Sequence, residues 1–279
     1  MQPRLGALRV ELDFGAVDLR WTEWGPAEGA AVVCVHGLTR NARDFDALAQ
    51  ALAAQGRRVL CVDVPGRGLS SWLPRGELYA VPNYVAAMRP LLAALDSYDW
   101  VGTSMGGLIG MAVAAMPESG MRRFVINDIG PFVPAASLER IRAYLRAAPA
   151  DFAGIEAVEA ELRRVHAPFG DLSDAEWRHL AIHSSRMTEG GRLRLHYDRA
   201  IAEPMGTEPL ADIEFWPLWD AAPERPVLVL RGETSDLLLP ETATRMAARA
   251  RVETIPGCGH APALMAPAQV ALVAGFLDG

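Results

Sequence analysis

Short, continuous apolar runs recur along this chain, and they constrain its fold more than any other feature. The runs are AVVCV (31–35), RVLCVDV (58–64), DWVG (99–102), RRFVIND (122–128) and PVLVLRG (226–232). Their length and lack of alternation are typical of parallel strands that are buried on both faces. Helical patterns fill the gaps between the first four runs, at residues 44–55, 83–95 and 104–116. This alternation predicts an α/β fold with a mostly parallel central sheet and helices on both faces.

Two regions depart from this alternation of strands and helices. Residues 8–14 and 17–24 alternate apolar and polar side chains around Gly15, which predicts an antiparallel N-terminal hairpin. Residues 131–219 show helical patterns but no convincing buried strand, and strand-like runs resume only at 226–232 and 252–255. We therefore expect residues 1–130 and 220–279 to form one core, interrupted by a helical insertion at 131–219.

Composition limits the possible partners. The formal net charge is −7 and the sequence has no basic patch, so a nucleic-acid partner is not expected. The longest apolar stretches, such as residues 108–116, are far shorter than the roughly 20 residues of a membrane span. The N-terminus also lacks the apolar run of a signal peptide, so a cytoplasmic protein without a membrane partner is expected. Cys34, Cys61 and Cys258 are widely spaced and predict buried free thiols.

The segment VGTSMGGLIG places Ser104 between Gly102 and Gly106, where a predicted strand gives way to a predicted helix. A serine on such a turn has a strained backbone and an exposed hydroxyl, and the glycines leave room for the strand and helix to approach each other. A glycine-rich chain can contain this pattern by chance, so the strand–turn–helix context carries the argument. Ser104 is thus a candidate nucleophile.

A serine nucleophile needs a base, and the base needs a group that orients it. In a strand–turn–helix architecture these partners are expected downstream, with the acid before the histidine. Asp236 follows the strand-like run 226–232, and His260 follows the next one. Parallel strands share their carboxyl ends, so we expect Ser104, Asp236 and His260 to meet at one edge of the sheet.

The chain resembles the α/β-hydrolase superfamily over nearly its whole length. The matching motifs are VVCVHGLTR, DVPGRGLSS, VGTSMGGLIG, RGETSD and GCGHAP, in the family's order. The resemblance implies that Ser104 is the nucleophile, His260 the base and Asp236 the acid. It also implies an oxyanion hole formed by the backbone N–H groups of Leu38 and Met105, and no metal or organic cofactor.

Some positions leave alternatives open. Asp128 occupies a place from which some family members supply the acid, but RGETSD matches the usual acid loop better, so we favour Asp236. His36 is expected to brace the oxyanion loop by hydrogen bonding. Thr103 stands where many relatives have histidine or asparagine, a position that usually packs behind the turn. His179 and His183 are four residues apart on a predicted helix, but no third zinc ligand is evident.

The resemblance implies a serine hydrolase that cleaves a small-molecule carboxylic ester through an acyl-enzyme. Residues 131–219 would then be a helical cap that helps to form the substrate pocket. A lactonase, a hydrolase of carbon–carbon bonds and a cofactor-free perhydrolase use the same three residues, and some family members act mainly as small-molecule receptors. The expected partner is a small-molecule substrate, and the expected assembly is a monomer or homodimer.

Overall fold

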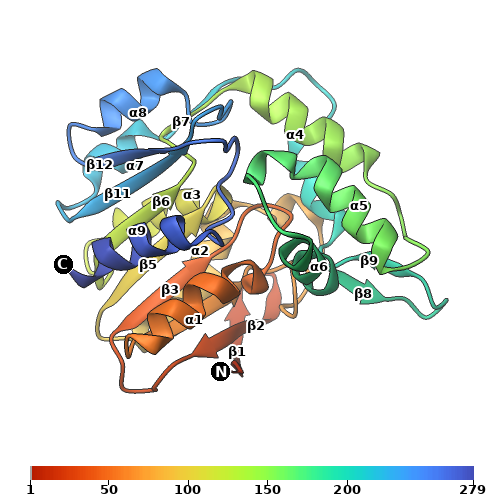
Figure 1. Cartoon of the computed structure of the whole chain (residues 1–279), viewed down its shortest axis with the longest axis horizontal. Helices are drawn as coiled ribbons and strands as arrows, with labels where there is room; N and C mark the ends of the chain where they lie inside the picture. The colour runs from red at the N-terminus through yellow and green to blue at the C-terminus, as the bar shows by residue number, and fades with distance from the viewer. Residues whose placement is uncertain (1) are drawn as a thin grey trace.

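The computed structural model describes residues 2–279 and is built around one eight-stranded sheet (Figure 1). Its strands, in spatial order, are β1 (Arg4–Leu12), β2 (Gly15–Trp24), β4 (Arg58–Asp63), β3 (Ala31–Val35), β5 (Tyr98–Thr103), β6 (Met121–Asn127), β11 (Val227–Gly232) and β12 (Arg251–Ile255). Strand β2 runs antiparallel to both β1 and β4. All other neighbours are parallel. This confirms the mostly parallel sheet with an antiparallel N-terminal hairpin.

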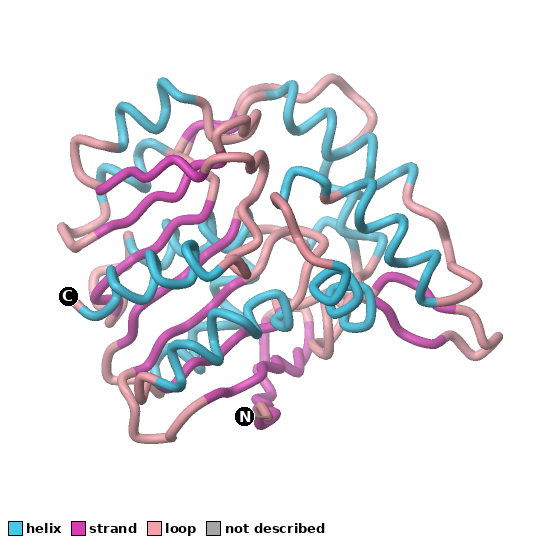
Figure 2. The backbone as a smooth tube through the Cα atoms, in the orientation of Figure 1, coloured by secondary structure: helices cyan, strands magenta, loops and turns pink. Residues whose placement is uncertain are grey.

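Side chains of the parallel strands alternate between two apolar layers, as the two-residue period of a strand requires. Val33 and Leu60 lie in the layer covered by helices α2 (Val81–Ala93), α3 (Met105–Ala114) and α8 (Pro240–Met246). Val32 and Cys61 lie in the other layer, under α1 (Asp46–Ala54) and α9 (Pro267–Asp278). Figure 2 shows helices flanking the sheet. Because these strands are buried on both faces, their sequences are continuous apolar runs.

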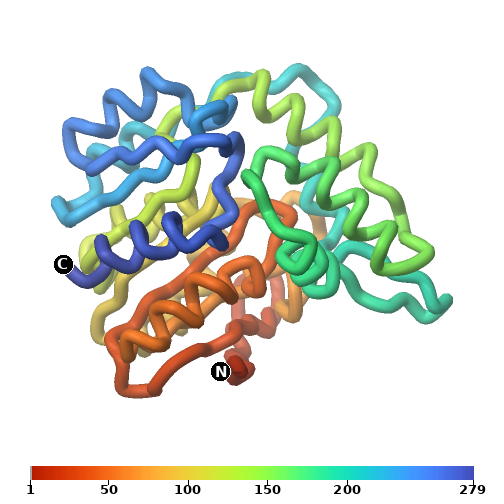
Figure 3. The backbone as a smooth tube through the Cα atoms, viewed as in Figure 1, coloured from red at the N-terminus to blue at the C-terminus, as the bar shows by residue number. Residues whose placement is uncertain are grey.

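The chain leaves the sheet after β6 and returns to it at β11, which pairs directly with β6. Figure 3 shows the two strands side by side, although residues 128–226 separate them in the sequence. Most of this long connection lies to one side of the sheet, on the right in Figure 1. The second half of the chain therefore completes the sheet that the first half begins.

Residues 131–219 are mainly helical. They contain α4 (Ala135–Ala147), α5 (Ile155–Val165) and α6 (Asp174–His183), and α7 (Trp216–Ala221) closes the segment. Helices α5 and α6 share a small apolar cluster that includes Val158, Leu162 and Trp177. The sequence analysis missed two short strand pairs here, β7 (Phe132–Val133) with β10 (Ile213–Glu214) and β8 (Ser185–Met187) with β9 (Leu193–Leu195). These strands are two or three residues long and mostly accessible, so they leave no apolar run to recognise.

Four short 3-10 helices complete the described elements: η1 (Ala42–Phe45), η2 (Gly76–Leu78), η3 (Ala167–Phe169) and η4 (Arg199–Met205). Between residues 2 and 279, no helix combines the length and the apolar character that crossing a bilayer would require. Cys34, Cys61 and Cys258 are buried free thiols, as expected.

Candidate active site

Ser104 lies on a sharp turn between strand β5 and helix α3. Its backbone angles are φ 52° and ψ −115°, a conformation that is strained for any residue except glycine. A Cβ at Gly102 would overlap the carbonyl oxygen of Gly106, and a Cβ at Gly106 would overlap that of Val35. Only glycine at these two positions lets strand and helix approach closely enough to form the turn.

Ser104, His260 and Asp128 form a continuous chain of hydrogen bonds. Ser104 Oγ lies 2.8 Å from His260 Nε2, and His260 Nδ1 lies 2.8 Å from Asp128 Oδ2. A carboxylate can only accept, so the imidazole carries its proton on Nδ1 and turns the lone pair of Nε2 toward the serine hydroxyl. Asp128 is fully buried. It also accepts bonds from the Gly232 N–H at 2.8 Å and the Ser235 hydroxyl at 2.6 Å, which fix the carboxylate's orientation.

Asp236 does not lie beside His260, and this part of the sequence-based prediction is wrong. Its side chain is about half exposed and forms an ion pair with Arg140, at 2.6 and 2.9 Å. The loop after β11 turns Ser235 inward, toward Asp128, and Asp236 outward. Strand β6 is the direct neighbour of β5, so its carboxyl end brings Asp128 closer to the turn that carries Ser104. The second candidate, Asp128, therefore takes the position next to the imidazole.

His36 braces the loop that follows β3. Its Nε2 accepts the Val64 N–H at 3.0 Å, and its Nδ1–H donates to the carbonyl of Gly37 at 2.7 Å. Burial lowers the pKa of His36 to about 3; the bond to Gly37 opposes this, and the charges of Arg67 and Arg40 add to it. The ring is therefore neutral at physiological pH and holds two loops together without carrying charge.

The backbone amides of Leu38 and Met105 have no hydrogen-bond acceptor within residues 2–279. Leu38 follows Gly37, where an added Cβ would come within 3.7 Å of the Ser104 Cβ. Met105 follows Ser104 directly and begins helix α3, where the amides point out of the helix and favour negative charge. Two unpaired donors thus flank the serine.

Thr103 and Asn127 lie behind the serine turn, where they are partners in the pairing of β5 with β6. The Asn127 side-chain amide donates to Thr103 Oγ1 at 3.0 Å and to the Pro262 carbonyl at 2.8 Å. Since Pro262 follows His260 by two residues, Asn127 joins the serine turn to the histidine loop. Asn127 and Ser235 were not singled out from the sequence, although Ser235 lies inside the motif RGETSD.

Residues of the 131–219 segment pack against the histidine loop. The Gly259 N–H donates to the Pro168 carbonyl at 2.7 Å, and the Ala263 N–H donates to that of Phe169 at 3.2 Å. The His166 ring stacks on Phe169 at 4.6 Å between centroids. Burial, with the charges of Arg40 and His260, holds the pKa of His166 well below its usual range. A second histidine is therefore neutral near His260.

Two small cavities, of about 20 Å³ each, lie under the 131–219 segment. Gly37, Thr103 and Phe169 line one, and Thr39 and Tyr144 are among the residues that line the other. A water molecule takes about 30 Å³ of liquid volume. Neither cavity can hold an ester substrate in this conformation.

The predicted pair His179 and His183 has a third potential metal ligand in the structure, Asp46, which the sequence analysis did not find. An arginine competes for the same atoms, because Arg43 Nε lies 3.0 and 2.9 Å from the two Asp46 oxygens and Arg43 Nη1 lies 3.3 Å from His183 Nδ1. Burial, then the charge of Arg43 and His179, lowers the pKa of His183 to about 4. This cluster joins α6 to the start of α1 through an arginine. His196 is also neutral at physiological pH, since burial and the charges of Arg186 and Arg194 lower its pKa to about 4.

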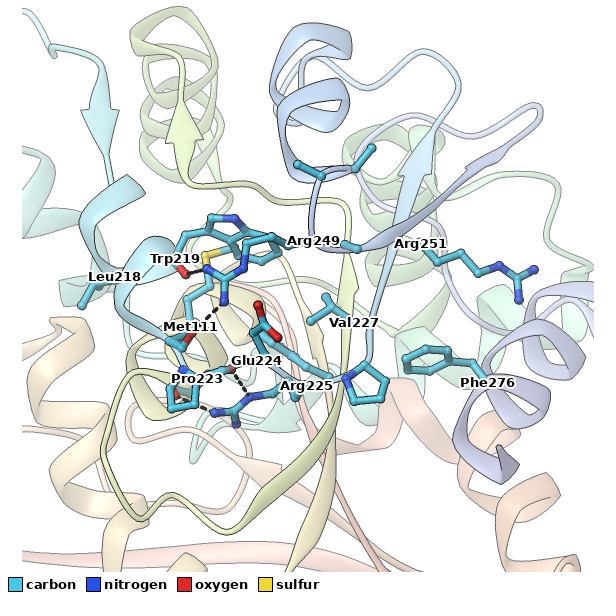
Figure 4. Close-up of a pocket in the computed structure, with 17 residues that line it drawn as sticks. Met111, Leu218, Trp219, Pro223, Glu224, Arg225, Val227, Arg249, Arg251 and Phe276 are labelled. Carbon is cyan, nitrogen blue, oxygen red and sulfur yellow. Dashed lines mark hydrogen bonds between the residues drawn. The ribbon is translucent and has the colours of Figure 1, made fainter.

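A larger pocket of about 750 Å³ lies at the opposite end of the sheet from Ser104, where β11 and β12 begin (Figure 4). Three arginines line it, and two of them, Arg249 and Arg225, donate to backbone carbonyls. Arg249 donates to the carbonyls of Trp219 and Ala222, both at 2.7 Å, and Arg225 donates to that of Ala114 at 2.9 Å. These arginines neutralise the carbonyl ends of α7 and α3. The pocket contains neither Ser104 nor His260.

Comparisons with known proteins show the family of this chain. Residues 32–272 match the alpha/beta hydrolase family. The chain is 42% identical to a 3-hydroxybutyrate-oligomer hydrolase from Cupriavidus necator, over 99% of this chain and 98% of that protein. It is 27% identical to an esterase from Mycobacterium tuberculosis, over 95% of this chain and 87% of that protein. A solved alpha/beta hydrolase from Novosphingobium aromaticivorans is 35% identical, with a TM-score of 0.87 over 100% of this chain and 99% of the other.

Proposed function

Because this chain belongs to the alpha/beta hydrolase family and is an ester hydrolase, we propose that Ser104, His260 and Asp128 are its catalytic triad. The observation that carries the proposal is the hydrogen-bonded chain from the serine hydroxyl through the imidazole to a fully buried carboxylate. Each residue comes from a loop at the carboxyl edge of the sheet. Asp236 has no place in this mechanism.

In the proposed reaction, His260 Nε2 takes the proton of Ser104 as Oγ attacks the carbonyl carbon of the ester. Asp128 stabilises the imidazolium that forms. The negative charge on the former carbonyl oxygen is stabilised by the amides of Leu38 and Met105, and a donor of this kind contributes about 3 kcal/mol to catalysis. His260 then protonates the leaving alcohol. In the second half of the reaction, His260 takes a proton from water as the water attacks the acyl-enzyme, and it returns a proton to Ser104 Oγ as the acid is released.

We propose that the substrate is a short oligoester of hydroxyacids, such as an oligomer of 3-hydroxybutyrate. The support is the relative from Cupriavidus necator, whose similarity extends over nearly the full length of both chains. Each linkage in such an oligomer is an ordinary carboxylic ester, so it needs only the residues named above.

We also propose that residues 1–130 and 220–279 form the catalytic core and residues 131–219 form a cap. The cap's contacts with the histidine loop, through Pro168 and Phe169, support this division. So do the small cavities between cap and core, where Tyr144 and His166 lie next to Thr39. In this arrangement the cap determines which ester reaches Ser104. The ester that reaches Ser104 in this proposal is a small molecule.

The test is a Ser104→Ala variant, assayed on p-nitrophenyl butyrate and on 3-hydroxybutyrate trimer with the products resolved by chromatography. We expect loss of both activities and of labelling by a fluorophosphonate probe, because the variant has no nucleophile. Ser97→Ala, at an exposed serine, is the matched control and should behave as wild type. Unchanged labelling of Ser104→Ala would refute the triad. Wild-type activity on the p-nitrophenyl ester with none on the trimer would refute the proposed substrate alone.

A further inference from the structure

Arg67, in the loop after β4, is a buried cation without a carboxylate partner among residues 2–279. Its side chain has no exposed surface. Within residues 2–279 its hydrogen bonds go to carbonyls, to a phenol and to a thioether. A buried charge that lacks an opposite charge is costly for a fold. Retaining one in the core needs an explanation.

Neutral groups compensate part of this cost. Nη1 donates to the Pro65 carbonyl and to the Tyr84 hydroxyl, both at 2.8 Å. The guanidinium carbon lies 5.5 Å from the ring centroid of Tyr79 and 5.1 Å from that of Tyr84, within the range of cation–π attraction. These groups lower the free-energy cost of burying the charge, but none of them supplies an opposite charge.

The other two nitrogens point to the candidate active site. Nε donates to the Leu38 carbonyl at 2.8 Å, and Nη2 meets the Met105 Sδ at 3.6 Å. A thioether is a weak acceptor, so the Nη2 donors remain nearly unpaired on this side. One rigid guanidinium thus contacts both residues whose amides flank Ser104. Its field also reaches the same loop at His36, where it adds to the effect of burial on the pKa.

We propose that Arg67 is a positioning residue for the oxyanion hole, holding Leu38 and Met105 in register and placing an uncompensated positive charge behind their amides. This inference rests on the proposed function. Before the reaction the charge has no counterion, and the oxyanion supplies one when it forms. Because the environment is buried, the attraction is stronger than it would be in water. Arg67 therefore stabilises the transition state more than the bound substrate.

The test compares Arg67→Met, which removes the charge and the donors, with Arg67→Lys, which keeps a charge but cannot bridge both residues. Tyr84→Phe is the matched control, because it removes one bond of Arg67 without touching Leu38 or Met105. The measurements are kcat and KM on a soluble ester, and the affinities for a trifluoromethyl ketone and for a neutral ether analogue of the ester. The ketone forms an anionic tetrahedral adduct with a serine, whereas the ether binds without charge and without forming an adduct.

For Arg67→Met we expect kcat to fall about 100-fold, the loss typical of a missing oxyanion donor, with KM changed less than about threefold. Ketone affinity should fall by a similar factor, and affinity for the neutral ether analogue should stay constant. Arg67→Lys should lose about tenfold in kcat and in ketone affinity, and Tyr84→Phe should resemble wild type. Should Arg67→Met fail to fold, the lysine variant decides the question alone.

Equal losses of affinity for the ketone and for the ether analogue would show a purely structural role and overturn the inference, as would an unchanged kcat in either variant. Failure of the proposed function is recognised separately, because Ser104→Ala would then remain active.

Discussion

Asp128 and Ser104 share an uncommon backbone feature. Both are non-glycine residues at positive φ, 58° and 52°, and both hydrogen-bond to the ring of His260. Such strain persists only where surrounding contacts over-determine the conformation. The bonds from Gly232 and Ser235 to the Asp128 carboxylate supply those contacts. This site therefore differs from the other loops in that two strained residues hydrogen-bond to the same imidazole ring.

Replacing Asp128 with asparagine should lower kcat about 10⁴-fold while the protein stays folded. An asparagine can accept from Nδ1 only in one orientation, and its amide favours the wrong imidazole tautomer, an effect of this size in serine hydrolases with a triad. Asp236→Asn is the matched control and should keep kcat within about twofold, because it removes only an exposed ion pair worth at most about 1 kcal/mol. Thermal unfolding checks that both variants fold. The reverse pattern of activities would return the role of the acid to Asp236.

At the scale of single residues, the sequence predicted that Ser104 and His260 meet at one edge of the sheet, and it identified both candidate aspartates. It favoured Asp236, which does not lie beside His260, because motif order tells which loops reach the site but not which side chain of a loop turns inward. In the loop after β11 that side chain is Ser235. Arg67 had no recognised role either, since its importance comes from the contacts it makes in the folded structure.

At the scale of elements, the strands and helices of the core were predictable because their patterns are long and buried. Strand β3 has the predicted bounds, and β4 and β11 differ from them by a single residue. Strands β8 and β9 were not predictable, because three accessible residues carry no periodicity. Backbone pairing, more than apolar patterning, forms them.

Helix α6 begins with a capping box that should be measurable on its own. Ser173 Oγ accepts the Glu176 N–H at 3.3 Å, and Glu176 Oε2 accepts the Ser173 N–H at 2.7 Å. Ser173→Ala should lower the free energy of unfolding by about 1 kcal/mol, the usual value of such a cap. Urea denaturation measures it, with Ser97→Ala as the control. An unchanged midpoint would mean that tertiary contacts alone hold the start of α6.

At the scale of the whole molecule, backbone and side-chain hydrogen bonds join the 131–219 segment to the core at several places, three of which lie near the candidate site. Gly68 donates to the His196 carbonyl at 2.9 Å, Gly259 to that of Pro168 at 2.7 Å, and the Asn41 side chain to that of His183 at 3.0 Å. Each tie joins a loop near the candidate site to the segment above it. Substrate entry then requires some of these bonds to open.

A disulfide can test this requirement. A Cβ at Gly170 would lie 2.7 Å from Cys258 Sγ, near the separation that a disulfide needs. In a Gly170→Cys variant oxidised with diamide, activity on p-nitrophenyl butyrate should fall at least tenfold and return on reduction. Gly170→Ser is the control, since φ at this position is 107° and any side chain adds strain of about 1–3 kcal/mol. Full activity with the crosslink proven by mass spectrometry would show that this tie need not open.

The hydrogen bond between Asp128 and Gly232 has a consequence for engineering. Asp128 lies where the chain leaves the sheet for the long connection, and Gly232 ends the strand on which it returns. One carboxylate therefore links the point where the chain leaves β6 to the last residue of the strand on which it returns, and at the same time it faces the imidazole. A foreign segment grafted in place of residues 131–219 would start three residues after this carboxylate and finish near Trp219, at the opposite end of the sheet. Libraries of such chimeras should vary in substrate preference while the chemistry is inherited intact.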